Sequence, residues 1–205
     1  MQVLILNGSP RKGGNTQVAL GEMKKIFDEN GVRYTQLDVG MQNIRGCIAC
    51  NQCGKLGKCV FDDGVNQAAQ LLSLADGVVV ASPVYYASAN GTLISFLDRL
   101  FYSCHQDLTM KVGASVVCAR RGGCSATFDE LNKYFTISGM PLASSQYWNS
   151  IHGRLPGEAD QDEEGKQTMR TLARNMVFLM KSIALGKEAF GLPEKEPRVS
   201  THYIR

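Results

Sequence analysis

The chain has 205 residues, of which 44% are hydrophobic, and a formal net charge of +3. This length and apolar content suffice for one compact domain with a sizeable core. Because the charge is small and the basic residues are scattered, we expect neither nucleic acid nor a membrane surface as a partner. No apolar stretch is long enough to span a bilayer and no secretory signal pattern precedes the first strand, so we expect a cytoplasmic location.

Strand and helix patterns alternate along the chain. We predict strands near residues 2–7, 32–38, 77–82, 111–118 and 140–147, and helices near 15–30, 65–75, 90–103, 124–137 and 161–185. Several of these strands are apolar on both faces, as in sheets covered by helices on both sides. The sequence therefore predicts an α/β fold with three layers, namely a doubly wound, five-stranded parallel sheet of order 2-1-3-4-5. We expect one domain over residues 1–185, with a cysteine-rich loop at 46–63 and a C-terminal tail at 186–205.

A glycine-rich turn joins the first predicted strand to the first predicted helix, with the sequence Asn-Gly-Ser-Pro-Arg-Lys-Gly-Gly-Asn-Thr. A helix N-terminus favours an anion, because its first N–H groups are unpaired and the helix dipole is positive there. The spacing fits neither the nucleoside-triphosphate P-loop nor the G-x-G-x-x-G dinucleotide loop. The turn predicts a phosphate site, with the candidate residues Ser9, Arg11, Gly14, Asn15 and Thr16.

Two later turns should reach the same ligand, because ligands of such sheets bind at the carboxyl ends of the strands. One turn, Pro-Val-Tyr-Tyr-Ala, follows the predicted strand at 77–82, and the other, Ala-Arg-Arg-Gly-Gly, follows the strand at 111–118. The candidate contacts are Pro83, Val84, Tyr85, Tyr86, Ala87, Ala119, Arg120, Arg121, Gly122 and Gly123.

Together with Phe-Leu-Asp-Arg at 96–99, these motifs resemble the flavodoxin-like, NAD(P)H-dependent FMN reductases over nearly the whole chain. The resemblance implies that the first turn holds the FMN phosphate and that the later turns flank the isoalloxazine and ribityl groups. It also implies electron transfer from NAD(P)H, the co-substrate, through FMN to a small-molecule acceptor such as a quinone, a nitroaromatic or a flavin. Hydride transfer requires no protein acid or base, so we assign no certain catalytic residue; Arg120 and Arg121 are candidate flavin stabilisers.

The resemblance has two further implications. Relatives of this kind are usually homodimers or homotetramers with FMN near the subunit interface. The segment Trp-Asn-Ser-Ile-His-Gly at 148–153 resembles one that closes over the flavin edge. His152 belongs to it, although a lone histidine is more often structural than catalytic.

Four of the seven cysteines lie close together, at Cys47, Cys50, Cys53 and Cys59. The ferredoxin cluster pattern has a shorter final gap and a proline after its last cysteine. The spacing instead resembles the compact motif of the iron-sulfur flavoproteins, relatives that carry a [4Fe-4S] cluster in this loop. Three interpretations stay open: a cluster, reduced thiols or a redox-labile disulfide, and a structural zinc site.

With an iron-sulfur cluster, the protein would be an electron carrier that receives electrons from a protein donor such as ferredoxin.

A different class of function on the same fold is a non-catalytic, receiver-like sensor. Such a sensor would need a group of acidic residues after the first strand, where Asn-Gly-Ser stands instead. The remaining cysteines, Cys104, Cys118 and Cys124, lack metal-like spacing, and we interpret each as a buried free thiol.

Overall fold

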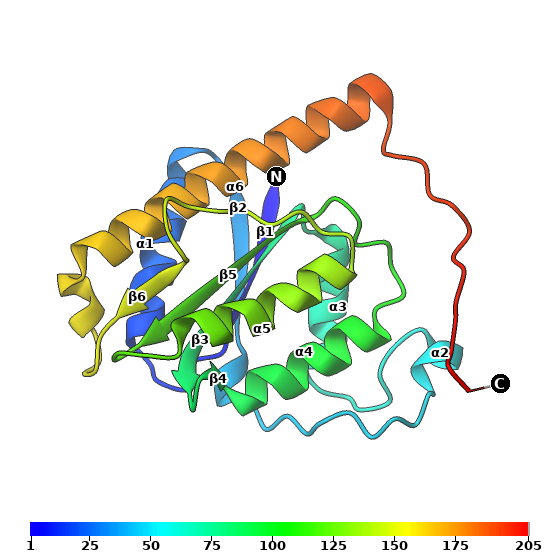
Figure 1. Cartoon of the computed structure of the whole chain (residues 1–205), viewed down its shortest axis with the longest axis horizontal. Helices are drawn as coiled ribbons and strands as arrows, with labels where there is room; N and C mark the ends of the chain where they lie inside the picture. Colours follow the sequence, from blue (N-terminus) through cyan, green and yellow to red (C-terminus); the bar gives the residue numbers. More distant parts are fainter. Residues whose placement is uncertain (205) are drawn as a thin grey trace.

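The computed structural model describes residues 1–204, which form a parallel sheet between two layers of helices (Figure 1). The sheet has the order β2-β1-β3-β5-β6. Its strands are β1 (Gln2–Asn7), β2 (Arg33–Asp38), β3 (Gly77–Tyr85), β5 (Val112–Ala119) and β6 (Ser150–His152), and the short β4 (Ser88–Ala89) pairs antiparallel with β3. Because β5 and β6 are the fourth and fifth parallel strands along the chain, the predicted order 2-1-3-4-5 is confirmed.

Helices cover both faces of the sheet. On one face lie α1 (Asn15–Glu29) and α6 (Glu163–Phe190), and on the other lie α3 (Gly64–Leu74), α4 (Gly91–Ser103) and α5 (Cys124–Ile137). Three short helical turns complete the chain: η1 (Val39–Met41), α2 (Cys53–Leu56) and η2 (Glu158–Gln161). Within residues 1–204, none of these helices is long and apolar enough to cross a membrane.

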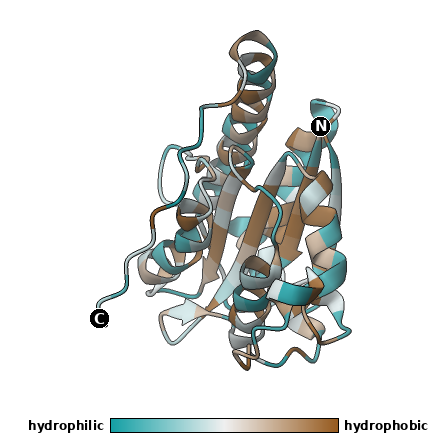
Figure 2. Cartoon of the chain, turned by 90° about the vertical axis from the view of Figure 1, so that its right-hand side faces the viewer, coloured by the Kyte–Doolittle hydropathy of each residue, from teal (hydrophilic) through white to brown (hydrophobic). Residues whose placement is uncertain are grey.

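Two hydrophobic cores result from the alternation of side chains along the buried strands. In β1, Val3 and Ile5 join the core under α1 and α6, whereas Leu4 and Leu6 join the core under α3, α4 and α5. Successive strand side chains point to opposite faces, so a strand that is apolar throughout contributes to both cores. Figure 2 shows this concentration of hydrophobic residues along the strands. The three-layer prediction is therefore confirmed.

The predicted position of the fifth strand, 140–147, is wrong. Leu142 makes only an isolated bridge to Gly113, and the strand that extends the sheet is β6, which begins at Ser150. The hydroxyl of Ser145 donates to the Tyr147 carbonyl at 2.6 Å and accepts from the Tyr147 N–H at 3.3 Å. Such local hydrogen bonds between a side chain and the backbone compete with the backbone hydrogen bonds between neighbouring strands. Regular pairing therefore starts only after this turn.

The C-terminal segment differs from a simple tail that starts at residue 186. Helix α6 continues to Phe190, and residues 191–204 follow without a helix or strand of their own. Lys195 in this segment forms an ion pair with Asp107. The proposed division into one domain and a tail stays a prediction.

Candidate functional site

A cavity of about 230 Å³ lies at the carboxyl edge of the sheet, between the loops that follow β1, β3, β5 and β6. Ten of the residues predicted from sequence line it: Ser9, Arg11, Gly14, Asn15, Thr16, Pro83, Val84, Tyr85, Ala119 and Arg120. The three predicted turns thus meet at one place. Five other predicted residues do not line the cavity: Tyr86, Ala87, Arg121, Gly122 and Gly123.

Three lining residues, Cys118, Gly153 and Arg154, are not among the predicted contacts, although Gly153 belongs to the segment at 148–153 that the resemblance implies closes over the flavin edge. Gly153 and Arg154 directly follow β6, so a correct position for that strand would have placed them at the carboxyl edge. Cys118 is the penultimate residue of β5, and the sequence predicts only a buried free thiol there. Burial raises the pKa of its thiol to about 12, so this part of the wall is neutral at physiological pH.

The turn after β1 leaves the start of α1 open to an anion. The side chain of Asn7 accepts from the Ser9 N–H at 3.1 Å, and the Ser9 hydroxyl accepts from the Arg11 N–H at 3.3 Å. The N-cap of α1 is Gly14, which has no side chain to bond the N–H groups of the first turn. These N–H groups therefore point toward the cavity end of the helix without a side-chain cap.

The loop after β6 packs closely on this turn. The side-chain oxygen of Asn15 accepts from the Ala159 N–H at 3.0 Å, which orients the amide. A Cβ at position 153 would lie 2.6 Å from Asn15 Nδ2, so only glycine fits at Gly153. The close approach closes one side of the cavity.

The turn between β3 and β4 is strained, and a residue outside it holds it in place. Tyr86 and Ala87 both have left-handed backbones, with φ of 51° and 59°. Consecutive positive φ values are typical of a type I′ turn, which normally uses Asn-Gly. Glu130 of α5 accepts from the Ser88 hydroxyl at 2.9 Å and from the Ala89 N–H at 2.8 Å. This carboxylate fixes the turn that presents the cavity wall, and no sequence motif marks it.

His152 lies outside the cavity. Its Nδ1 is 3.4 Å from a carboxylate oxygen of Asp162, and its Nε2 is 3.8 Å from the sulfur of Cys124. It lines a separate hollow beside Trp148. The segment that carries it thus borders the candidate site without placing the imidazole in it.

A second hollow gathers all four clustered cysteines, which line it together with residues of α4. Cys47 and Cys50 are exposed, whereas Cys53 and Cys59 are partly buried. The residues on either side of Cys50, Ala49 and Asn51, have left-handed backbones, with φ of 52° and 56°. The four cysteines therefore border one hollow.

The arrangement of the thiols bears on which metal group they suit. In residues 1–204, no three Cys, His, Asp or Glu side chains are arranged to hold a single metal ion. The thiols as placed therefore do not form a zinc site, which needs ligands converging on one point. A [4Fe-4S] cluster makes a different demand, because each thiolate binds a different iron. The hollow holds about 20 Å³, room for about one water, so a cluster requires the exposed Cys47 and Cys50 to move outward.

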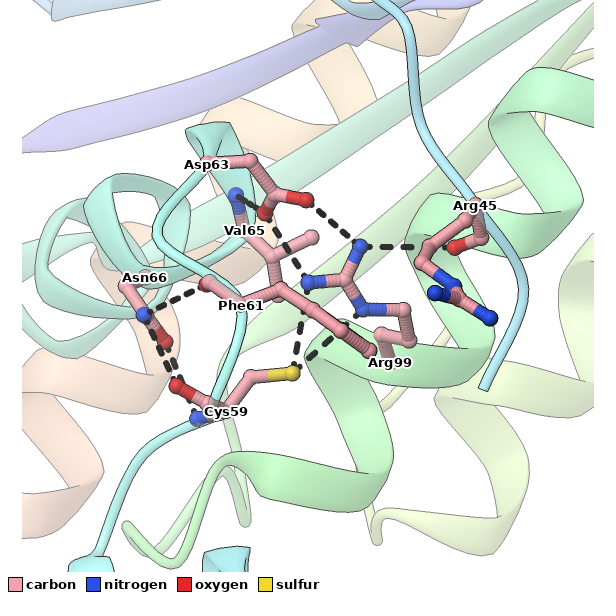
Figure 3. Close-up of polar contacts among 7 residues, drawn as sticks. All are labelled: Arg45, Cys59, Phe61, Asp63, Val65, Asn66 and Arg99. Carbon is pink, nitrogen blue, oxygen red and sulfur yellow. Dashed lines mark hydrogen bonds and ion pairs between the residues drawn. The ribbon is translucent and has the colours of Figure 1, made fainter. Parts of the chain in front are cut away.

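A buried arginine organises the fourth cysteine (Figure 3). Arg99 of α4 is 1% exposed, and its Nε and Nη2 donate to the sulfur of Cys59 at 3.4 and 3.2 Å. Its Nη1 and Nη2 also donate to the two carboxylate oxygens of Asp63 at 2.6 and 3.0 Å. Burial by itself would lower the pKa of Arg99, but the bonds to Asp63 and Cys59 outweigh it and raise the pKa. The guanidinium is thus charged, paired and fixed beside the sulfur.

Comparison with known proteins agrees with this architecture. The family described as NADPH-dependent FMN reductase matches residues 1–153. An iron-sulfur flavoprotein of Methanocaldococcus jannaschii is 29% identical over 191 residues, covering 89% of this chain and 99% of the relative. An iron-sulfur flavoprotein of Archaeoglobus fulgidus is 31% identical over 209 residues, covering 89% of this chain and 95% of the relative.

Solved structures share the fold at low sequence identity. An NAD(P)H:quinone oxidoreductase from Methanothermobacter marburgensis has a TM-score of 0.68 at 16% identity, covering 86% of this chain and 96% of that one. The crystal structure of RosB has a TM-score of 0.71 at 16% identity, covering 100% of this chain and 94% of that one. These likenesses confirm the flavodoxin-like fold.

The fold and the matches together define a flavin oxidoreductase. More specifically, the chain belongs to the NADPH-dependent FMN reductase family, and it is an NAD(P)H-dependent enzyme that uses FMN. The family predicted from the sequence motifs is thus confirmed, as are the FMN and NAD(P)H predictions.

Replacement of the carboxylate beside the buried guanidinium tests the structural role of this pair. Asp63→Asn removes the charge that compensates Arg99 but keeps a side chain able to cap α3. We expect urea denaturation to show a loss of about 2 kcal/mol in unfolding free energy, below the range for fully buried pairs because Asp63 is partly exposed. The neighbouring, exposed Asp62 supplies the control Asp62→Asn. An equal loss in both variants would contradict the assignment.

Proposed function

We propose that the cavity at the carboxyl edge binds FMN and that the protein passes electrons from NAD(P)H through it to a small-molecule acceptor. The carrying observation is that the uncapped N-terminus of α1 and the turns after β3 and β5 line the same cavity. An anion held at the helix start leaves the rest of its carrier molecule facing the two later turns.

The residues of the cavity suit FMN in two respects. The hydroxyls of Ser9 and Thr16, the guanidinium of Arg11 and the backbone at Gly14 offer phosphate donors around the first turn. Pro83, Val84 and Tyr85 offer a largely apolar wall for a ring system.

FMN, when bound, supplies hydride acceptance and the release of electrons to a second substrate. The chain supplies binding and charge. Arg120 lines the cavity and Arg121 does not, so Arg120 is the side chain that we assign to favour electron uptake. The neutral thiol of Cys118 adds no opposing charge to this wall.

The second substrate is a quinone, a nitroaromatic or a flavin in our proposal. The side chain of Tyr86 is fully exposed at the tip of the strained turn and offers an aromatic surface outside the cavity. Exposed aromatic groups beside a redox site suit planar acceptors, because stacking needs no specific hydrogen bond.

A second candidate function is an iron-sulfur electron carrier with a [4Fe-4S] cluster on Cys47, Cys50, Cys53 and Cys59. Two observations favour it. The four cysteines line one hollow. The two relatives named above are iron-sulfur flavoproteins, and this chain matches each of them over nearly its whole length. A protein donor such as ferredoxin would then supply electrons to the same FMN domain.

We further propose a homodimer or homotetramer in the cytoplasm. Tyr147 and Trp148 are exposed and pack together with ring centroids 5.0 Å apart, on the segment that borders the candidate site. Paired exposed aromatic side chains are enriched in protein interfaces.

The phosphate assignment predicts loss of FMN affinity in variants of the first turn. Arg11→Ala and Thr16→Ala each remove a donor from the cavity, and we expect FMN affinity to fall about tenfold in each. Fluorescence titration of apoprotein with FMN measures this. Lys12→Ala is the matched control, because Lys12 is exposed and does not line the cavity. Unchanged affinity in both test variants would rule out the phosphate turn.

Nicotinamide-dependent reduction is the direct test of the proposed electron route. Mixing FMN-loaded protein anaerobically with NADH or NADPH should bleach the flavin absorbance, followed by recovery when a quinone is added. Reduced ferredoxin, tried separately, tests the alternative donor. Bleaching by ferredoxin with no response to either nicotinamide would reverse our choice between the two routes.

Metal analysis separates the candidate functions. If the protein is an iron-sulfur electron carrier, the anaerobically purified protein should contain FMN with about four irons and four sulfides per chain. Cys50→Ala should then lose the iron and keep FMN, because the flavin cavity contains none of the four thiols. Cys104→Ala is the control, since Cys104 does not line the cysteine hollow. Zinc, or protein without metal, would argue against the cluster.

A further inference from the structure

A chain of hydrogen bonds outside the flavin cavity leads to Ser9 in the turn after β1. It starts at Lys24 on α1, whose Nζ donates to Oε1 of Gln36 at 2.6 Å. Nε2 of Gln36 donates to Oδ1 of Asp38 at 2.6 Å, and Nδ2 of Asn7 donates to the same oxygen at 2.9 Å. Oδ1 of Asn7 then accepts from the Ser9 N–H at 3.1 Å. The chain thus connects α1 and β2 to the turn after β1.

The chemistry of the groups in this chain fixes the direction of its bonds. The ammonium of Lys24 can only donate and the carboxylate of Asp38 can only accept, so the Gln36 amide between them can lie only one way round. Asn7 lies between Asp38 and the Ser9 N–H, which can only donate, so its amide is fixed as well. A reversed amide would place two donors against each other at Ser9. Asp38 therefore holds the Asn7 side chain in the orientation that the turn needs.

The bonds at Ser9 leave its hydroxyl proton for the cavity. Its Oγ accepts from the Arg11 N–H at 3.3 Å, and within residues 1–204 no protein acceptor takes its O–H. The hydroxyl lies at the start of α1, because a Cβ added to Gly14, the N-cap, would be 3.4 Å from Ser9 Oγ. Ser9 is buried and lines the cavity. Its hydroxyl can therefore donate to an anion bound there.

We propose that Asp38, although it does not line the cavity, is a positioning residue for the FMN phosphate. It orients Asn7, which holds the backbone at Ser9, so that the Ser9 hydroxyl donates to a phosphate oxygen. This inference rests on the proposed binding of FMN in the cavity and adds a prediction about selectivity. The chain of bonds acts on the phosphate end of the ligand alone. Asp38 should therefore favour FMN over riboflavin, which has the same ring system and no phosphate.

Asp38→Ala tests the proposal, and the fold should tolerate it because Asp38 is exposed. The Asn7 side chain, which is 4% exposed, loses the acceptor that fixes its amide. We expect FMN affinity to fall about fivefold and riboflavin affinity to stay unchanged, as measured by fluorescence titration of the apoprotein with each flavin. The direction of the change is diagnostic, because loss of a negative charge beside an anion site would by electrostatics alone raise FMN affinity.

Two further variants make the result specific. Asp38→Asn keeps an oxygen that accepts from Gln36 and Asn7, so it should retain most of the FMN affinity. Asp28→Ala removes another exposed carboxylate whose charge acts on Lys24 but which is not part of the chain of bonds. FMN affinity should not change in this control.

A double-mutant cycle tests whether Asp38 acts through Ser9. In the Ser9→Ala protein the hydroxyl is already absent, so the further change Asp38→Ala should lower FMN affinity by less than about twofold. The cycle uses FMN alone, so it decides the question even where riboflavin binds too weakly to measure.

The contradicting outcomes separate this inference from the function beneath it. Unchanged FMN affinity in Asp38→Ala, or equal losses of FMN and riboflavin affinity, would overturn the inference and leave FMN binding intact. Equal losses in Asp38→Ala and Asp38→Asn, or full additivity with Ser9→Ala, would also overturn it. Absence of FMN binding to the unsubstituted protein would instead overturn the proposed function.

Discussion

The structure depends on the crossover of the chain at β1. From β1 the chain passes to β2 on one side and then to β3 on the other, and both pairings are parallel. The loops that follow β1 and β3 therefore leave the same edge of the sheet in different directions, which opens a crevice between them. Helices bury both faces of the sheet, so this edge is where loops can meet a ligand. The strand order alone therefore determines where the cavity lies, and the side chains determine what it can bind.

Helix α4 links the two candidate sites. At its start, Asn90 accepts from the N–H groups of Thr92 and Leu93, and its own N–H donates to the hydroxyl of Ser82, at 2.9 Å, in β3. At its end, the same helix carries Arg99 and Ser103 into the cysteine hollow. A helix of 13 residues, about 20 Å long, thus runs from the strand beside the candidate cavity to the cysteine hollow. The sequence places both sets of polar groups on one element.

Much of the fold could be predicted because its signals are local. The strand at β1 and the helix at α5 begin and end where the apolar pattern predicts, and the glycine-rich turn marks its own role as a helix start. The position of β6 could not be predicted, because a short strand flanked by polar residues carries little periodic signal and its pairing with β5 is long-range. The same error concealed Arg154. Glu130 and Arg99 act across distances of about 40 residues, which spacing within one segment cannot reveal.

The buried Arg99 is hard to explain by stability alone. A buried ion pair gains little over apolar side chains of similar volume, because desolvation of both charges offsets their attraction. An aliphatic residue at this place would serve the core under α4 as well, yet Arg99 directs two N–H groups to the sulfur of Cys59 and none of its polar atoms to water. Asp63 balances the guanidinium charge, so the pair adds donors to the hollow without adding net charge. The arrangement is therefore better explained as a means of positioning Cys59 than as a source of stability.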